Sequence, residues 1–231
     1  MDGCRAGWFA VAIASEAHWG FGLYRTIAEM ACVYRWAELF LIDIPIGLPS
    51  ITRRRCDVEA RRLLGRPQAS SIFPVPCRAA LAAADYRDAC AINAQTLGAK
   101  LSKQTWNILP KIREVDEWLR QDGSARWREC HPELAFWALA GERLVGNGKK
   151  TLAGRDERLV LLRAYFKGTD VLLTAALAAH PRKAVASDDI VDALALAVTA
   201  WLSGGELARV PERPEFDATG LPMEMVFARL K

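Results

Sequence analysis

The sequence predicts an α/β fold in which a mixed sheet is covered by helices on both faces. An apolar, β-rich hairpin opens the chain, and a short apolar strand follows it. A strongly apolar helix that begins with acidic residues comes near the end, after a long and mainly helical segment. Strands, then helices, then a closing helix is the order expected of a sheet with helices packed on both sides.

The hairpin is predicted from two β-rich runs that lie close together. Residues 8–14 (WFAVAIA) and 19–25 (WGFGLYR) are rich in aromatic and aliphatic side chains. Residues 15–18 between them are short enough to form the turn of an antiparallel hairpin. Residues 26–36 then carry apolar side chains at helical spacing, so a helix is expected there.

A buried strand is predicted at residues 39–44 (LFLIDI). This apolar run is ended by Pro45, Gly47 and Pro49. A continuous apolar run ended by turn residues is typical of a strand buried on both faces. Asp43 is the charged residue of the run and lies where the strand leaves the sheet.

The middle of the chain is predicted to be helical. The clearest helices cover residues 79–98 and 103–119, and Pro110 is expected to kink or divide the second. We therefore expect a single domain over residues 1–231 with a helical insertion over about residues 50–122.

A second strand and further helices are expected beyond the insertion. Residues 125–130 are predicted to form a strand that ends at Glu129, and Pro132 suits the first turn of the helix that follows, through residue 140. The further helices are expected at residues 155–166, 170–179 and 188–202.

Composition and charge narrow the class of protein. With 52% hydrophobic and 25% charged residues, the chain can bury a core and stay soluble. No stretch approaches the roughly 20 apolar residues that span a bilayer, and no secretory segment opens the chain, so we expect a cytoplasmic protein without membrane contact. The six cysteines lack a CxxC pair and are expected to be reduced thiols. The net charge of +4 is compatible with a polyanionic partner, although the arginines within residues 53–66 suit a solvated helix face slightly better than a phosphate-binding patch.

Carboxylates occupy several places where they do not favour stability. A buried charge costs several kcal/mol unless it is paired or bound to metal. Carboxylates that converge at one edge of a sheet therefore indicate a metal site, and Mg²⁺ and Mn²⁺ prefer such oxygen ligands. These residues stand at the start of the chain, at the ends of two predicted strands and at the start of the closing helix: Asp2, Asp43, Glu129, Asp188, Asp189 and Asp192.

The start of the closing helix is the most informative part of this set. Asp189 and Asp192 are three residues apart and share one helix face. Helix capping, with Ser187 or Asp188 as the N-cap, is the alternative, because acidic residues stabilise a helix N-terminus. Capping does not explain Asp192, which lies a full turn inside an apolar sequence.

The other acidic residues have structural alternatives that the sequence leaves open. Asp43 is also compatible with an Asx turn before Pro45. Glu129 is also compatible with a strand-edge ion pair to Arg126 or Arg128, and His131 with an ordinary loop histidine. Taken together, the positions of these residues indicate a site, whereas no single residue does.

Four motifs, in this order along the chain, carry a resemblance to a known family. The motifs are residues 2–8 (DGCRAGW), 42–49 (IDIPIGLP), 129–133 (ECHPE) and 188–195 (DDIVDALA). Together they resemble the family of predicted RNase H-like nucleases, over nearly the whole chain. The last motif also resembles the final helix of RuvC-type Holliday-junction resolvases. The resemblance implies an RNase H-like mixed five-stranded sheet flanked by helices.

The resemblance also implies an activity and a site. In the wider superfamily, acidic residues of the first strand, the fourth strand and the last helix hold the metals. By position, the catalytic metal ligands here would be Asp2, Asp43, Asp189 and Asp192, binding two Mg²⁺ or Mn²⁺ ions for hydrolysis of phosphodiester bonds in nucleic acid. Asp188, Glu129 and His131 would be accessory residues, and Arg5, Lys149 and Lys150 would contact the substrate.

Some expectations stay open at this stage. Family members carry apolar residues before the Asp-Gly-Cys motif, whereas here Asp2 follows Met1 directly, so we expect the true start to lie upstream. A non-catalytic binding or scaffold protein on the same fold and a relative of the actin-like ATPases and sugar kinases are the rival interpretations. A homodimer is compatible with the sequence, which does not distinguish DNA from RNA as the partner.

Overall fold

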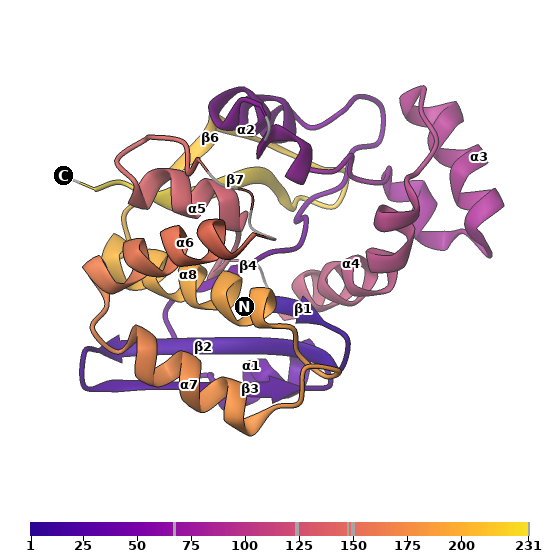
Figure 1. Ribbon diagram of the computed structural model, residues 1–231. Coiled ribbons are helices and arrows are strands. Elements are labelled where there is room, and N and C mark those ends of the chain that lie inside the picture. The colour runs from indigo at the N-terminus through magenta and orange to yellow at the C-terminus, as the bar shows by residue number, and fades with distance from the viewer. Residues whose placement is uncertain (67, 123–124, 147, 149–150, 231) are drawn as a thin grey trace. The chain divides into compact units, whose positions relative to one another are not determined.

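The computed structural model describes residues 1–66, 68–122, 125–146, 148 and 151–230 (Figure 1). The chain divides into two compact units, which are described separately below. The first unit comprises Met1–Asp43, Arg126–Ala208 and Val226–Lys231, and the second comprises Ile44–Ala125 and Arg209–Met225. The expected helical insertion falls inside the second unit, and a single domain over residues 1–231 stays a prediction.

The first unit opens with three antiparallel strands: β1 (Asp2–Cys4), β2 (Gly7–Ser15) and β3 (His18–Tyr24). The predicted hairpin is therefore confirmed. The hydroxyl of Ser15 accepts hydrogen bonds from the N–H groups of Ala17 and His18, at 3.3 and 3.1 Å, and so closes the turn. Phe9 and Val11 alternate inward from β2 and belong to the main apolar core of this unit.

Two further strands of the first unit pair in parallel. β4 (Phe40–Ile42) lies beside β5 (Trp127–Glu129), with Ile42 opposite Glu129. The rings of Phe40 and Trp127 stack with centroids 4.3 Å apart at the other end of the pair. Because the strands are parallel, Asp43 and Glu129 come to the same edge, as the sequence predicted.

The strands of the described residues form one three-stranded and two two-stranded sheets, and the expectation of one five-stranded sheet is corrected accordingly. The physical reason lies between β1 and β4. There Met1 donates from its amino group to the Leu41 carbonyl at 2.8 Å and accepts from the Asp43 N–H at 3.1 Å. These hydrogen bonds hold Met1 against β4, but one residue does not make a strand ladder.

Within the described residues five helices complete the first unit, and each coincides with a helix predicted from the sequence to within a few residues. α8 packs against β1, β2 and β4, with Ile190 and Leu194 in the core. The bounds are α1 (Ile27–Val33), α5 (Pro132–Leu139), α6 (Leu152–Tyr165), α7 (Thr169–Ala179) and α8 (Ser187–Ser203).

The second unit is mainly helical, as predicted. α4 runs through Pro110 as one helix, so the division is wrong and the kink, which was the other expectation at Pro110, stays a prediction. The bounds of its elements are α2 (Arg55–Leu64), short 3₁₀ turns at Gln68–Ser71 and Arg78–Ala82, α3 (Tyr86–Leu97) and α4 (Lys103–Asp122). β6 (Leu207–Phe216) and β7 (Pro222–Ala228), which lie mostly in this unit and were not predicted, form a two-stranded sheet.

The arginine-rich segment of the second unit is more than a solvated helix face. Arg54 is 1% exposed, forms an ion pair with Asp57 and donates to the Ile46 carbonyl at 3.1 Å. Arg55 is exposed and pairs with Glu59 one helical turn away. The segment therefore combines a buried structural arginine with surface ones.

All six cysteines lie within the described residues and are free thiols, as predicted. Within those residues, no helix combines the length and the apolar character that crossing a bilayer demands.

Candidate acidic site

The first two carboxylates of the site are carried by β1 and by the residue that directly follows β4. Asp2 is buried on β1, opposite Phe9 of β2. Asp43 is half-buried and directly follows β4. The hydrogen bonds of Met1 to Leu41 and Asp43 fix the backbone on which both side chains are carried.

α8 supplies the other two predicted ligands. Asp189 accepts a hydrogen bond from the Ala186 N–H at 3.0 Å, and Ala186 is the N-cap residue in place of the expected Ser187 or Asp188. Asp189 therefore does have the capping role that the sequence left open. Asp192 is 4% exposed and lies one turn further along the helix. A carboxylate at that position is beyond the N-terminal N–H groups that a cap satisfies.

The electrostatics of Asp2 show that these four carboxylates share one region. Burial raises the pKa of Asp2 well above its usual range, and the charges of Asp43, Asp192 and Asp189 raise it further. The Met1 amino group opposes this shift. Charge interactions weaken with distance, so three carboxylates that act on a fourth must lie near it. The structure thus places Asp43, Asp189 and Asp192 near enough to Asp2 to act on its charge, and a single site formed by all four stays a prediction.

Two neighbouring groups have shifted pKa values as well. Burial lowers the pKa of the Met1 amino group to about 6, although Asp2, Cys130 and Asp43 raise it. Burial also raises the pKa of the Cys130 thiol well above its usual range, and Asp43 and Glu129 add to that shift. Cys130 is therefore expected to be a neutral thiol that lines the site without titrating near neutral pH.

The predicted accessory residues lie around this cluster. Glu129 is buried at the end of β5 and close enough to Cys130 to influence its pKa. His131 is the N-cap residue of α5, and its Nδ1 accepts from the Glu133 N–H at 3.2 Å. That contact is structural, and an accessory role of His131 in a reaction stays a prediction. Asp188 is exposed in the first turn of α8.

The predicted substrate contacts are less well placed. Arg5 is exposed in the turn between β1 and β2. Lys149 and Lys150 lie outside the described residues. Contact of these three residues with a substrate stays a prediction.

The donor chemistry of the cluster fits a divalent cation. Carboxylate oxygens are the ligands that Mg²⁺ and Mn²⁺ prefer, and a cation would relieve the repulsion that raises the pKa of Asp2. Among the described side chains, however, no group of three or more His, Cys, Asp or Glu residues is close enough together to hold a metal ion. A shared metal site therefore stays a prediction that the donor chemistry supports.

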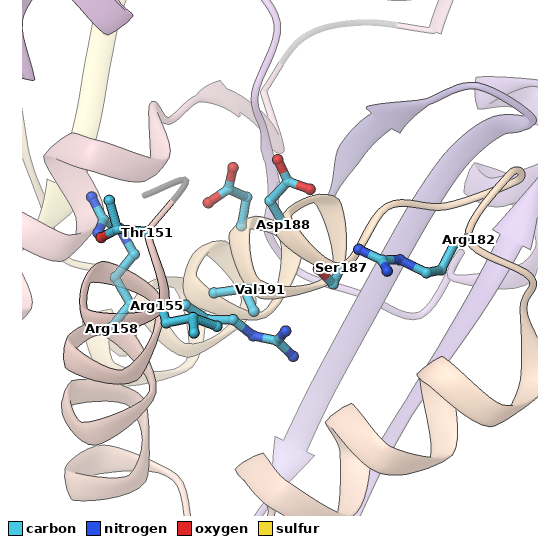
Figure 2. Close-up of a pocket in the computed structure, with 9 residues that line it drawn as sticks. Thr151, Arg155, Arg158, Arg182, Ser187, Asp188 and Val191 are labelled. Atoms are coloured by element: carbon cyan, nitrogen blue, oxygen red, sulfur yellow. The ribbon is translucent and has the colours of Figure 1, made fainter. Parts of the chain in front are cut away.

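A pocket beside the cluster was missed by the sequence analysis. Its volume is about 320 Å³. Figure 2 shows the side chains that line it, from α6, from the loop before α8 and from the start of α8. They are Thr151, Leu152, Arg155, Arg158, Arg182, Ser187, Asp188, Val191 and Asp192. The spacing of Arg155 and Arg158 on one helix face was a signal in the sequence, but the approach of Arg182 depends on tertiary structure.

Comparison with known proteins gives a family and no activity. A family model described as "Protein of unknown function (DUF429)" matches residues 1–216. The match confirms the family to which the motifs pointed, whereas the nuclease activity stays a prediction. No curated protein and no solved structure shows significant similarity to the chain.

Proposed function

We propose that this chain, which belongs to the DUF429 family of proteins of unknown function, is a metal-dependent phosphodiesterase that acts on nucleic acid. One observation carries the proposal: Asp43, Asp189 and Asp192 each raise the pKa of the buried Asp2. Folding alone does not favour such an accumulation of like charge, whereas binding of a divalent cation does.

An RNase H-like arrangement of the first unit is part of the proposal. Its support is the mixed strand pairing, antiparallel among β1, β2 and β3 and parallel between β4 and β5. The hydrogen bonds of Met1 to Leu41 and Asp43 follow the pattern of a parallel bridge between β1 and β4. α8 packs across these strands and carries the remaining carboxylates.

In the proposed reaction, the carboxylates hold and orient Mg²⁺ or Mn²⁺. Asp2 and Asp43 would contribute ligands from the strands, and Asp189 and Asp192 from the helix. The bound cations would lower the pKa of a coordinated water and stabilise the leaving oxygen of the phosphodiester. The hydrogen bond from the Ala186 N–H presets the orientation of the Asp189 carboxylate, and burial restricts Asp192.

The test is a cleavage screen with Mn²⁺ or Mg²⁺ over branched DNA, duplex DNA, RNA–DNA hybrids and RNA. Asp43→Asn and Asp192→Asn keep the side-chain shape and remove the charge, so cleavage should fall at least about a hundredfold. Asp170→Asn is the matched control, because Asp170 pairs with Arg163 on the surface of the first unit. Absence of metal-dependent cleavage of every substrate would favour the scaffold interpretation instead.

A further inference from the structure

The pocket beside the acidic site has a basic side with three arginines, two of which have no carboxylate partner among the described residues. On α6, Arg158 pairs with Glu133 and Arg163 with Asp170, each through hydrogen bonds to both carboxylate oxygens. Arg155, on the same helix, and Arg182, in the loop before α8, form no ion pair with a described residue. Their charge is therefore available to a ligand.

The two arginines are directed to one place. In Figure 2 the side chains of Arg155 and Arg182 extend toward the start of α8 from different sides, and the carboxylate of Asp188 points away from them. Ser187, between them at the first turn of the helix, adds a hydroxyl group. This set of donors suits a group with several anionic oxygens.

The framework that carries these arginines is held in place. The Ala6 N–H donates to the Ala184 carbonyl at 3.2 Å and ties the loop of Arg182 to the turn after β1. Arg158 fixes α6 to α5 through its buried pair with Glu133, at 2.7 Å, and also donates to the Gly154 carbonyl at 2.9 Å. The backbone that carries the two arginines is thus held in place, which lowers the cost of binding a ligand.

The position of the pocket next to the acidic site indicates the class of ligand. Asp192 belongs both to the pocket and to the acidic site, so the two are continuous. A volume of about 320 Å³ lies at the lower end of the roughly 300–1,000 Å³ that small-molecule pockets have. We propose that Arg155 and Arg182 bind a backbone phosphate of the nucleic acid strand next to the phosphate that is cleaved. This inference rests on the proposed function.

The experiment measures fluorescence anisotropy of labelled single-stranded DNA and RNA oligonucleotides in Ca²⁺, before any cleavage. Arg155→Gln and Arg182→Gln should each weaken binding about tenfold. Each should also reduce the slope of log K against log salt by about 0.7 on a single strand. Lys183→Gln is the matched control, because Lys183 is exposed beside Arg182 and outside the pocket lining. Circular dichroism checks that each variant is folded.

The outcomes separate this inference from the proposed function. If both arginine variants bind oligonucleotide as Lys183→Gln does, the pocket assignment is wrong, whether or not the protein cleaves. Arginine-dependent binding without cleavage in Mn²⁺ would support the pocket and count against the nuclease. If inorganic phosphate or a nucleoside monophosphate, but no oligonucleotide, raises Tm in an arginine-dependent way, the pocket takes a free phosphate and the strand assignment is overturned.

Discussion

Buried aspartates have opposite surroundings in the two units of the chain. In the second unit Asp217 pairs with Arg78 and accepts hydrogen bonds from the N–H groups of Leu48 and Thr219. Burial alone would raise the pKa of Asp217, but these hydrogen bonds hold it below its usual range. In the first unit Asp2 faces other carboxylates and its pKa is raised.

The difference distinguishes carboxylates that stabilise a fold from carboxylates that a fold tolerates. Arg78 also donates to Asp116, at 2.7 Å, and Arg120 pairs with Asp116 as well, so two arginines balance two buried acids of the second unit. Around Asp2, the Met1 amino group opposes a rise in pKa that burial and three carboxylates cause. Functional sites are often places where local stability has been given up for chemistry.

Loss of the Asp217 charge should have the largest effect on stability. Asp217→Asn removes a buried charge that pairs with Arg78 and accepts hydrogen bonds from the N–H groups of Leu48 and Thr219, which should cost about 3 kcal/mol of the free energy of unfolding. Urea denaturation gives this value. Asp170→Asn, at an exposed pair, should leave the urea midpoint nearly unchanged. Equal midpoints for the two variants would show that the buried network does not stabilise the unit.

Mn²⁺ should stabilise the wild-type protein by a comparable amount. A cation at a hundred times its Kd adds about 2.7 kcal/mol, because it binds the folded state alone. Differential scanning fluorimetry should show a rise in Tm that Asp43→Asn and Asp192→Asn abolish and Asp170→Asn retains. A Tm that does not change when Mn²⁺ is added would contradict a shared cation site.

Removal of the Asp2 charge should change stability in the opposite direction to removal of the Asp217 charge. Without divalent cations, Asp2→Asn relieves buried repulsion and should stabilise the protein by on the order of 1 kcal/mol, about 2 to 4 °C in Tm. The same substitution should remove cleavage. A lower Tm for Asp2→Asn would mean that the Asp2 carboxylate is stabilising in the folded protein.

The pH dependence should give the smallest but most specific effect. The pKa of Asp217 is lowered, so its stabilisation is present above the usual aspartate pKa of about 3.9 and is lost as pH falls through the lower value. The pKa of Asp2 is raised, so its cost appears as pH rises above about 4. Tm differences from wild type, measured against pH, should shrink in acid for both variants, with opposite signs. Differences that do not change with pH would contradict both assignments.

The sequence predicted the positions of the acidic residues along the strands and α8 better than it predicted the sheet, while the site that they would form stays a prediction. Asp43 and Glu129 were placed correctly because a parallel strand pair must bring equivalent ends to one edge. Asp192 was predicted as a site residue because an acidic residue one turn inside an apolar helix does not cap that helix. Both inferences depend on short segments of the sequence and need no knowledge of the tertiary structure.

The missed features depend on contacts between distant segments. β6 (LARVPERPEF) carries charges and prolines that mask the alternation of a strand. Arg54 was expected on a solvated helix face, but it is buried and donates to the Ile46 carbonyl. Arg78 pairs with Asp116 and Asp217, which lie 38 and 139 residues away along the chain. The pocket arginines Arg155 and Arg182 likewise approach each other through the packing of α6 and α8.

The hydrogen bond between Asp189 and the Ala186 N–H links occupancy of the acidic site to the integrity of a helix end. A ligand that rotated the Asp189 carboxylate toward itself would take away the acceptor of that amide and loosen the first turn of α8. The Ala186 amide would then exchange its hydrogen with deuterated solvent faster in the liganded protein, while the strands beneath became better protected. The first turn of α8 would become less stable while the strands became more stable.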